Sequence, residues 1–106
     1  MDLITRDELK AALASDAPPT LVMTLGEFGY RAKRIPGSLH VQTPEDAERL
    51  LASDDDIVVY CADEASPASR MAYELLKRAG HRRVRRYAGG VADWERAGLP
   101  LEGELA

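Results

Sequence analysis

The run Ile57–Cys61, IVVYC, constrains the fold of this chain more than any other segment. Its β-branched and aromatic residues favour a strand. It also lacks the alternation of apolar and polar residues that a strand with one wet face shows. We therefore predict a central strand at Ile57–Cys61 that is covered on both faces of its sheet.

The segments on either side alternate between strand and helix patterns. Thr5 and Glu8 have the spacing of a capping box, which predicts a helix over about Arg6–Ala14. The pattern further predicts strands at Leu21–Leu25, Ser38–Val41 and Val84–Ala88, and helices from Thr43-Pro44 through Leu51 and over Val91–Ala97.

The helix after Cys61 has the clearest pattern. Ser66 and Pro67 provide a cap and a first helical position, and Gly80 provides a stop. Its apolar stripe is predicted to consist of Ala68, Met71, Ala72, Leu75, Leu76 and Ala79. Such a helix packs on a sheet.

Strands that alternate with helices over short connections indicate parallel pairing through right-handed crossovers. We therefore predict a single domain over residues 1–106, an α/β fold with a mostly parallel sheet flanked by helices on both faces. Ligands of such sheets bind beyond the carboxyl ends of the strands. Cys61 lies at that edge.

Charge and composition limit the classes of partner that we expect. The 106 residues carry a formal charge of −4 spread along the chain, so we expect neither nucleic acid nor a membrane as a partner. Cys61 is the only cysteine, which excludes an internal disulfide and fits a reducing cytoplasm. We expect no metal and no cofactor.

The loop after Cys61 suits a reactive thiol. A free thiol, with a pKa near ~8.5, needs donors or cations to ionise near neutral pH. Loop amides from Ala62 to Ser66, at a helix start, can supply donors to a charged sulfur. Asp63 and Glu64 oppose ionisation, and Arg70 is the nearest cation in the sequence. From spacing alone, a buried structural cysteine is an equally good reading.

The basic run Arg82–Arg86 is typical of a solvated edge. It also leads into Gly89-Gly90 at the functional end of the sheet. Arg85 or Arg86 could therefore face the site and restore positive charge there.

The whole chain resembles a single-domain rhodanese-like protein. The resemblance rests on the turn Ile35-Pro36-Gly37, on the strand that ends in Tyr60-Cys61, and on the closing pattern GG-x3-W-x3-G. The glycines and tryptophan of that pattern are Gly89, Gly90, Trp94 and Gly98. The resemblance implies a parallel sheet of about five strands, with Cys61 carrying a sulfane sulfur as a persulfide that loop amides stabilise.

Several positions depart from the family pattern. Many rhodaneses have an arginine after a loop of four residues, where this chain has Ser66, and the loop here is about two residues longer. Met23 and Leu25 replace an aspartate and an arginine, and Arg34 replaces a histidine. These changes argue against thiosulfate as the preferred sulfur donor.

Two hypotheses follow. In the first, the protein is a sulfurtransferase or persulfide carrier: Cys61 takes sulfur from a small-molecule or protein persulfide and passes it to a thiol or another nucleophile. The binding loop would comprise Ala62, Asp63, Glu64, Ala65, Ser66 and Arg70. In the second, the chain is a non-catalytic rhodanese-like recognition or regulatory module, in which Cys61 is retained as packing and a protein is the partner.

Overall fold

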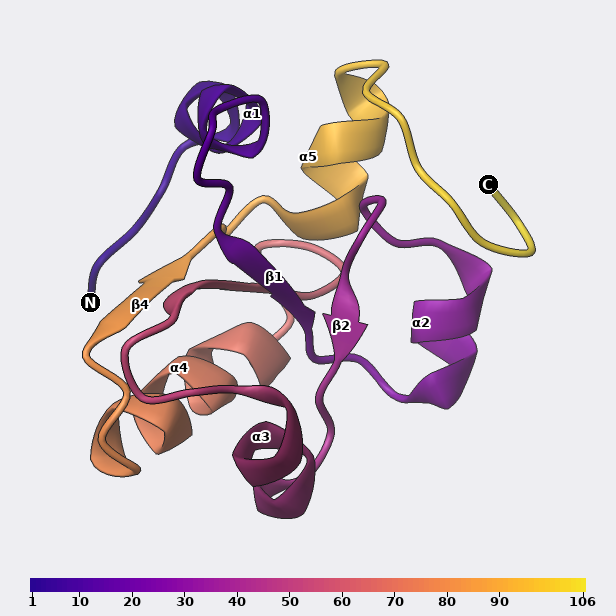
Figure 1. Cartoon of the computed structure of the whole chain (residues 1–106). Coiled ribbons are helices and arrows are strands. Elements are labelled where there is room, and N and C mark those ends of the chain that lie inside the picture. Colours follow the sequence, from indigo (N-terminus) through magenta and orange to yellow (C-terminus); the bar gives the residue numbers. More distant parts are fainter.

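A computed structural model describes all 106 residues. Its core is a parallel sheet of four strands in the order β2-β1-β3-β4 (Figure 1). The strands are β1 (Thr20–Met23), β2 (Leu39–His40), β3 (Asp56–Tyr60) and β4 (Arg83–Arg86). The helices are α1 (Arg6–Leu13), α2 (Glu27–Ala32), α3 (Pro44–Leu50), α4 (Ala68–Arg78) and α5 (Gly90–Arg96).

Helices cover both faces of the sheet, as the unbroken apolar pattern of Ile57–Cys61 predicted. Val58 and Tyr60 of β3 point to the face covered by α1 and α5. Ile57 and Val59 point to the opposite face, under α3 and α4. Each face buries its own apolar cluster, so β3 is closed off from solvent on both sides.

The structure has four strands where the resemblance implied about five, and two isolated bridges lie outside them. Leu3 forms an isolated parallel bridge with Arg86 at the β4 edge. The Ile4 amide donates to the Arg86 carbonyl, and the Arg86 amide donates to the Asp2 carbonyl. The α/β class and the parallel sheet are confirmed, with four full strands in place of about five.

The predicted helix starts are confirmed where side chains cap them. Thr5 and Glu8 form the expected capping box at α1, and Thr43 and Asp46 form a second one at α3. The prediction for α4 was wrong in one respect. Pro67 precedes its first residue, and no side chain caps the helix, so Ser66 is not its cap.

The buried stripe of α4 was also partly wrong. Ser69, Tyr73 and Leu76 are the buried residues of the helix. Met71 and Leu75 are instead 60% and 54% exposed. The helix is therefore rotated relative to the prediction, and its small, polar Ser69 faces the sheet.

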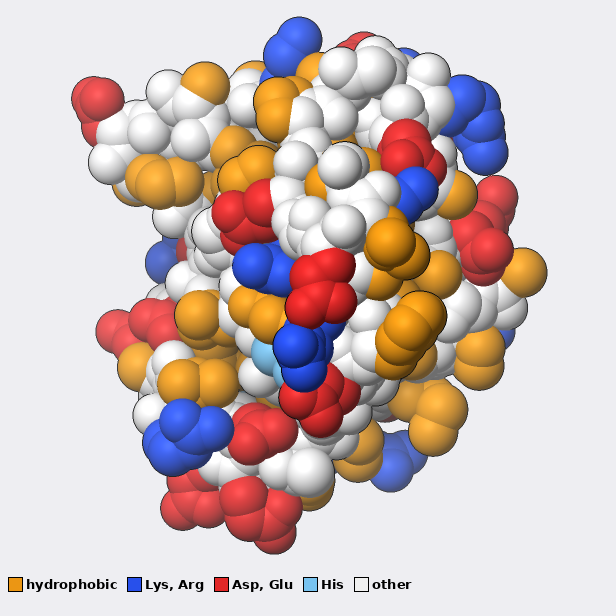
Figure 2. Space-filling view, turned by 90° about the vertical axis from the view of Figure 1, so that its right-hand side faces the viewer, with side chains coloured by type: hydrophobic (Ala, Val, Ile, Leu, Met, Phe, Trp, Pro, Cys, Tyr) orange, Lys and Arg blue, Asp and Glu red, His pale blue; other side chains and the backbone are white.

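No helix of the structure is long and apolar enough to cross a membrane. Figure 2 shows acidic and basic side chains interspersed over one face of the molecule, with no broad field of a single sign on that face.

Candidate active site

Cys61 directly follows β3 and is only 1% exposed. Two amides at the start of α5 fix its backbone, because Val91 N–H donates to the Cys61 carbonyl at 3.0 Å and Ala92 N–H donates to the Ala62 carbonyl at 2.8 Å. This docking requires Gly90, which has a φ of 63°. A Cβ atom at Gly90 would lie 2.3 Å from the Cys61 carbonyl oxygen. The GG motif therefore serves to bring α5 against the cysteine.

The sulfur of Cys61 is surrounded by oxygen atoms. Ser69 Oγ is nearest at 3.1 Å, followed by the Ser66 carbonyl oxygen at 3.5 Å and the Asp63 carbonyl oxygen at 3.8 Å. No backbone N–H donates to the sulfur in this arrangement. A thiol donates to such acceptors, whereas an anionic sulfur would be repelled by the two carbonyls. We call this arrangement, with the sulfur buried and facing acceptors, the closed loop. The amide cradle for a charged sulfur stays a prediction.

Neither loop carboxylate forms a hydrogen bond with the sulfur. Asp63 Oδ1 accepts the Ser66 amide at 3.0 Å, so this carboxylate ties the loop to itself. Asp63, Glu64 and Ala65 are exposed, and Ala62 and Ser66 are half-buried. Arg70 is exposed on α4 and makes no side-chain hydrogen bond or ion pair, so it does not compensate the loop charge through a direct contact.

A buried arginine lies behind Ser69 instead. Arg86 Nε donates to Ser69 Oγ at 2.8 Å, and Arg86 is only 5% exposed. Ser69 Oγ is the same atom that lies 3.1 Å from the Cys61 sulfur. A chain of contacts therefore runs from a cation on β4, through a hydroxyl on α4, to the sulfur at the end of β3.

Of the two arginines that the sequence singled out, only Arg86 reaches the site. Arg85 points to the other face of the sheet and pairs with Asp56 at 3.0 Å. Successive side chains of a strand point to opposite faces of the sheet, so Arg85 and Arg86 cannot share a face. Val84 is buried under α4, so Arg86, two residues later, shares its face. No local signal in the sequence indicated Ser69.

Tyr60, next to the cysteine, anchors the IPG turn. Its buried hydroxyl accepts the Ile35 amide at 2.9 Å and bonds to Ser38 Oγ. Burial raises the pKa of Tyr60 to about 12. The phenol therefore stays protonated at neutral pH and acts as a structural bond between β3 and the turn.

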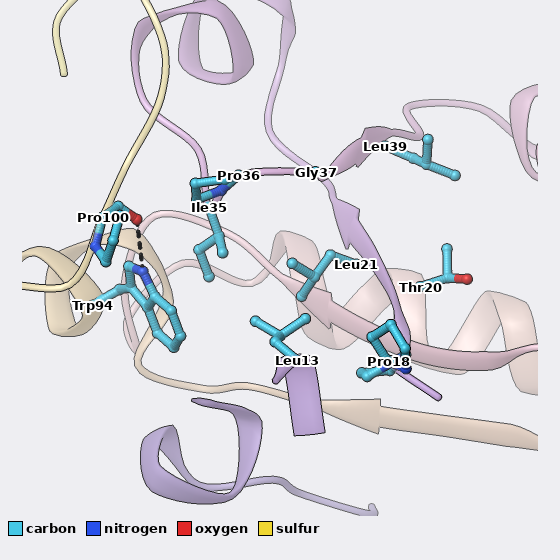
Figure 3. Close-up of a pocket in the computed structure, with 11 residues that line it drawn as sticks. Leu13, Pro18, Thr20, Leu21, Ile35, Pro36, Gly37, Leu39, Trp94 and Pro100 are labelled. Atoms are coloured by element: carbon cyan, nitrogen blue, oxygen red, sulfur yellow. Dashed lines mark hydrogen bonds between the residues drawn. The ribbon is translucent and has the colours of Figure 1, made fainter. Parts of the chain in front are cut away.

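A broad, mainly apolar cleft lies away from this chemistry. It has a volume of about 630 Å³ and is lined by apolar side chains that include Leu21, Ile35 and Trp94 (Figure 3). Thr20, the first residue of β1, also lines it, so the cleft opens at the amino ends of the strands. It contains no titratable side chain, and its only hydroxyl is that of Thr20. We therefore place the candidate active site at Cys61, at the carboxyl end of the sheet.

Potential metal ligands do not gather anywhere in the fold: no group of three or more His, Cys, Asp or Glu side chains could hold an ion. The fold and the site together define a parallel α/β domain with one buried cysteine at the carboxyl end of its central strand.

Comparison with known proteins identifies the family. The family model for the rhodanese-like domain matches residues 5–97, and the chain belongs to this family. The rhodanese-like domain of the Alr3790 protein from Anabaena sp. is similar in structure, with a TM-score of 0.85 and 28% identity over 99% of this chain and 81% of that one.

Two further relatives differ in what they are described as doing. A structure described as a probable thiosulfate sulfurtransferase is 30% identical, with a TM-score of 0.73, and covers 94% of this chain and 47% of that one. The HTH-type transcriptional regulator Rv0324 of Mycobacterium tuberculosis is 36% identical over 103 residues, which are 95% of this chain and 45% of the regulator. The chain thus spans a little under half the length of that curated relative.

Proposed function

We propose that the protein is a sulfurtransferase or persulfide carrier that moves a sulfane sulfur through Cys61. The observation that carries the proposal is the contact of the Cys61 sulfur with Ser69 Oγ, which in turn binds the buried cation Arg86. A cysteine kept only as packing has no need of a buried hydroxyl and a buried guanidinium beside its sulfur. The similarity to a probable thiosulfate sulfurtransferase supports the same chemistry.

The reaction is a pair of displacements at sulfur. The Cys61 thiolate attacks the outer sulfur of a persulfide donor, R–S–SH, and the donor's S–S bond breaks. The leaving group R–S⁻ takes the bonding electron pair and a proton, and Cys61 is left as a persulfide. An acceptor thiolate or cyanide then attacks the outer sulfur, and Cys61 leaves as the thiolate. No external oxidant or reductant is consumed.

The closed loop has to open for this chemistry. Cys61 is almost fully buried, and two carbonyl oxygens face its sulfur. Loop residues Ala62–Ser66 must turn their amides toward the persulfide for the anion to be stabilised. For the Ser66 amide to turn toward the sulfur, its hydrogen bond to the Asp63 carboxylate has to break.

The charge of the loop favours particular donors. Asp63 and Glu64 are exposed at the entrance, and Arg70 forms no pair with either of them. A dianion such as thiosulfate is repelled there, whereas a persulfide on a small thiol or a protein is less affected. We therefore propose persulfides as the donors, acting in a reducing cytoplasm that keeps Cys61 as a thiol.

Two-substrate kinetics test the proposal. Initial rates measured with a cysteamine persulfide donor, whose ammonium group offsets the charge of its persulfide, and cyanide as acceptor should give parallel double-reciprocal lines, since the two half-reactions share only the Cys61 persulfide. Cys61→Ser should abolish turnover. Thiosulfate should be the slower donor, and raised salt should help thiosulfate more than the persulfide. Turnover that survives in Cys61→Ser would refute the proposal.

A second candidate is a regulatory module without turnover. The similarity to a transcriptional regulator favours it, as does the burial of the sulfur in the closed loop. In that case Cys61 would accept no sulfur from any donor, and Cys61→Ser would leave partner binding unchanged. Formation of a Cys61 persulfide separates the two candidates.

A further inference from the structure

We propose that Arg86 is a positioning residue that stabilises negative charge on the Cys61 sulfur through Ser69, and so takes the place of the arginine that the loop lacks. The inference deepens the proposed function, and it rests on that function only for its biological purpose. The reactivity of the thiol can be measured whether or not sulfur is transferred.

Arg86 is a buried cation without an anionic partner. It takes part in none of the ion pairs of the structure, in contrast to Arg83 and Arg85, which both contact Asp56. Its Nη2 is fully buried and has no hydrogen-bond partner. A buried charge is costly unless an opposite charge compensates it. The group best placed to become that opposite charge is Cys61, one hydroxyl away.

The hydroxyl of Ser69 is oriented by its neighbours. A guanidinium can only donate hydrogen bonds, so Ser69 Oγ must be the acceptor toward Arg86 Nε. Its own proton makes no other hydrogen bond and can turn to the sulfur when the thiol ionises. Donation from a cation to the oxygen polarises the O–H group and strengthens the bond that it gives onward. Ser69 thus transmits the charge of Arg86 to the sulfur.

The other charged groups around the sulfur cannot provide this effect. The loop after Cys61 and the first turns of α4 and α5 carry Asp63, Glu64, Arg70 and Asp93. The two loop carboxylates and Arg70 are exposed and screened by solvent. Asp93 is engaged by Arg6 and by the Tyr87 hydroxyl. Arg86 is the one charge that is both buried and linked to the sulfur by hydrogen bonds.

The sheet register explains why Arg86 reaches this position. Arg86 is paired in register with Val59, which points to the α4 face two residues before Cys61. The small side chain at Ser69 lets the start of α4 approach both groups. An arginine supplied by β4 is fixed by the sheet, whereas an arginine in the loop would move when the loop opens. The sulfur therefore keeps its electrostatic support in both loop states.

The test is the pH dependence of Cys61 alkylation by iodoacetamide, a neutral reagent, in Arg86→Gln, Ser69→Ala and the matched control Arg85→Gln. Loop opening scales the rate at every pH, whereas a lost charge moves the midpoint of the rate–pH curve. We expect the midpoint to rise in Arg86→Gln and Ser69→Ala, with alkylation at neutral pH slowed about tenfold, the value of one hydrogen bond to a charged group. Arg85→Gln should keep the wild-type midpoint.

Two further variants test whether Arg86 and Ser69 act on the sulfur along one path. Arg86→Lys keeps the charge and should recover part of the shift. The double variant Arg86→Gln/Ser69→Ala should shift the midpoint little further than either single variant, because both act on one path. If Ser69→Ala, which removes only one oxygen, retains the wild-type midpoint, the inference is overturned, whatever the folding of the Arg86 variants. If the alkylation midpoint rises in Arg86→Gln and Ser69→Ala as expected, but the wild-type protein forms no persulfide, only the proposed function is refuted.

Discussion

Substitution of Gly90 by alanine tests how the fold holds Cys61, the candidate active-site cysteine. Gly90 has a φ of 63°, and an added Cβ would lie 2.3 Å from the Cys61 carbonyl oxygen and 2.9 Å from the Ala62 carbonyl carbon. Both neighbours are backbone atoms of the docked segment and cannot move aside cheaply. We expect α5 to separate from the loop after β3.

The cost follows from three terms. A left-handed backbone costs an alanine about 1–2 kcal/mol. The separation weakens the bonds from Val91 and Ala92 to the Cys61 and Ala62 carbonyls, worth about 0.5–1.5 kcal/mol each. The total of about 2–5 kcal/mol is below the 5–15 kcal/mol stability of a typical domain, so we expect Gly90→Ala to fold but to be clearly weakened.

Gly98→Ala is the matched control. Gly98 also has a positive φ, 76°, but nothing lies within 4 Å of its added Cβ. It therefore loses only the backbone term, and urea unfolding should show Gly90→Ala to be less stable than Gly98→Ala by about 1–3 kcal/mol. Gly90→Ala should also alkylate faster at Cys61, since the segment is released. Equal stabilities of the two variants would refute the proposed role of Gly90.

Three further predictions concern the framework. Tyr60→Phe leaves the buried Ile35 amide without its acceptor and should lower the free energy of unfolding in urea by about 1–3 kcal/mol; an unchanged value would contradict the anchoring role. Bonds from Thr5 hold the pKa of Glu8 below its ordinary 4.5, so its contribution to stability is present above that pH and is lost as the pH falls through the lowered value. Glu8→Gln should flatten the acid side of a plot of melting temperature against pH. Met71→Lys and Leu75→Lys should each change the free energy of unfolding by less than about 0.5 kcal/mol, because both side chains are exposed. A large loss of stability would mean that both side chains are buried, as the sequence predicted.

Patterns with a strict physical cause were predictable from the sequence. The capping box at Thr5 and the Thr43-Pro44 pair predicted the starts of α1 and α3, and the structure confirms both. The unbroken apolar run of β3 implied helices on both faces, and the two core clusters confirm it. Gly80, with a φ of 99°, follows the end of α4 as expected of a glycine stop.

Other features could not be read from hydrophobicity. No residue of α2 is buried, so Glu27–Ala32 lacked the apolar period that reveals a helix. Met71 and Leu75 looked like core residues of α4, but Tyr73 and Ser69 face the sheet. Tertiary packing decided the rotation of that helix, and it placed the small side chain of Ser69 next to Cys61.

The candidate site was predictable only in part. The position of Cys61 at the carboxyl end of a central strand followed from the alternation of strands and helices. Ser69 did not, because a loop of unknown path separates it from Cys61. Arg86 was one of two arginines considered, and only the burial of Val84 on the same face distinguishes it from Arg85.

The central claim is that Cys61 carries a sulfane sulfur, and intact-mass measurement after incubation with a persulfide donor tests it most directly. We predict a gain of one sulfur atom that is absent in Cys61→Ser and that disappears on addition of cyanide, with thiocyanate released in equal amount. The same gain in Cys61→Ser, or no gain in the wild-type protein with either cysteamine persulfide or thiosulfate, would contradict the account.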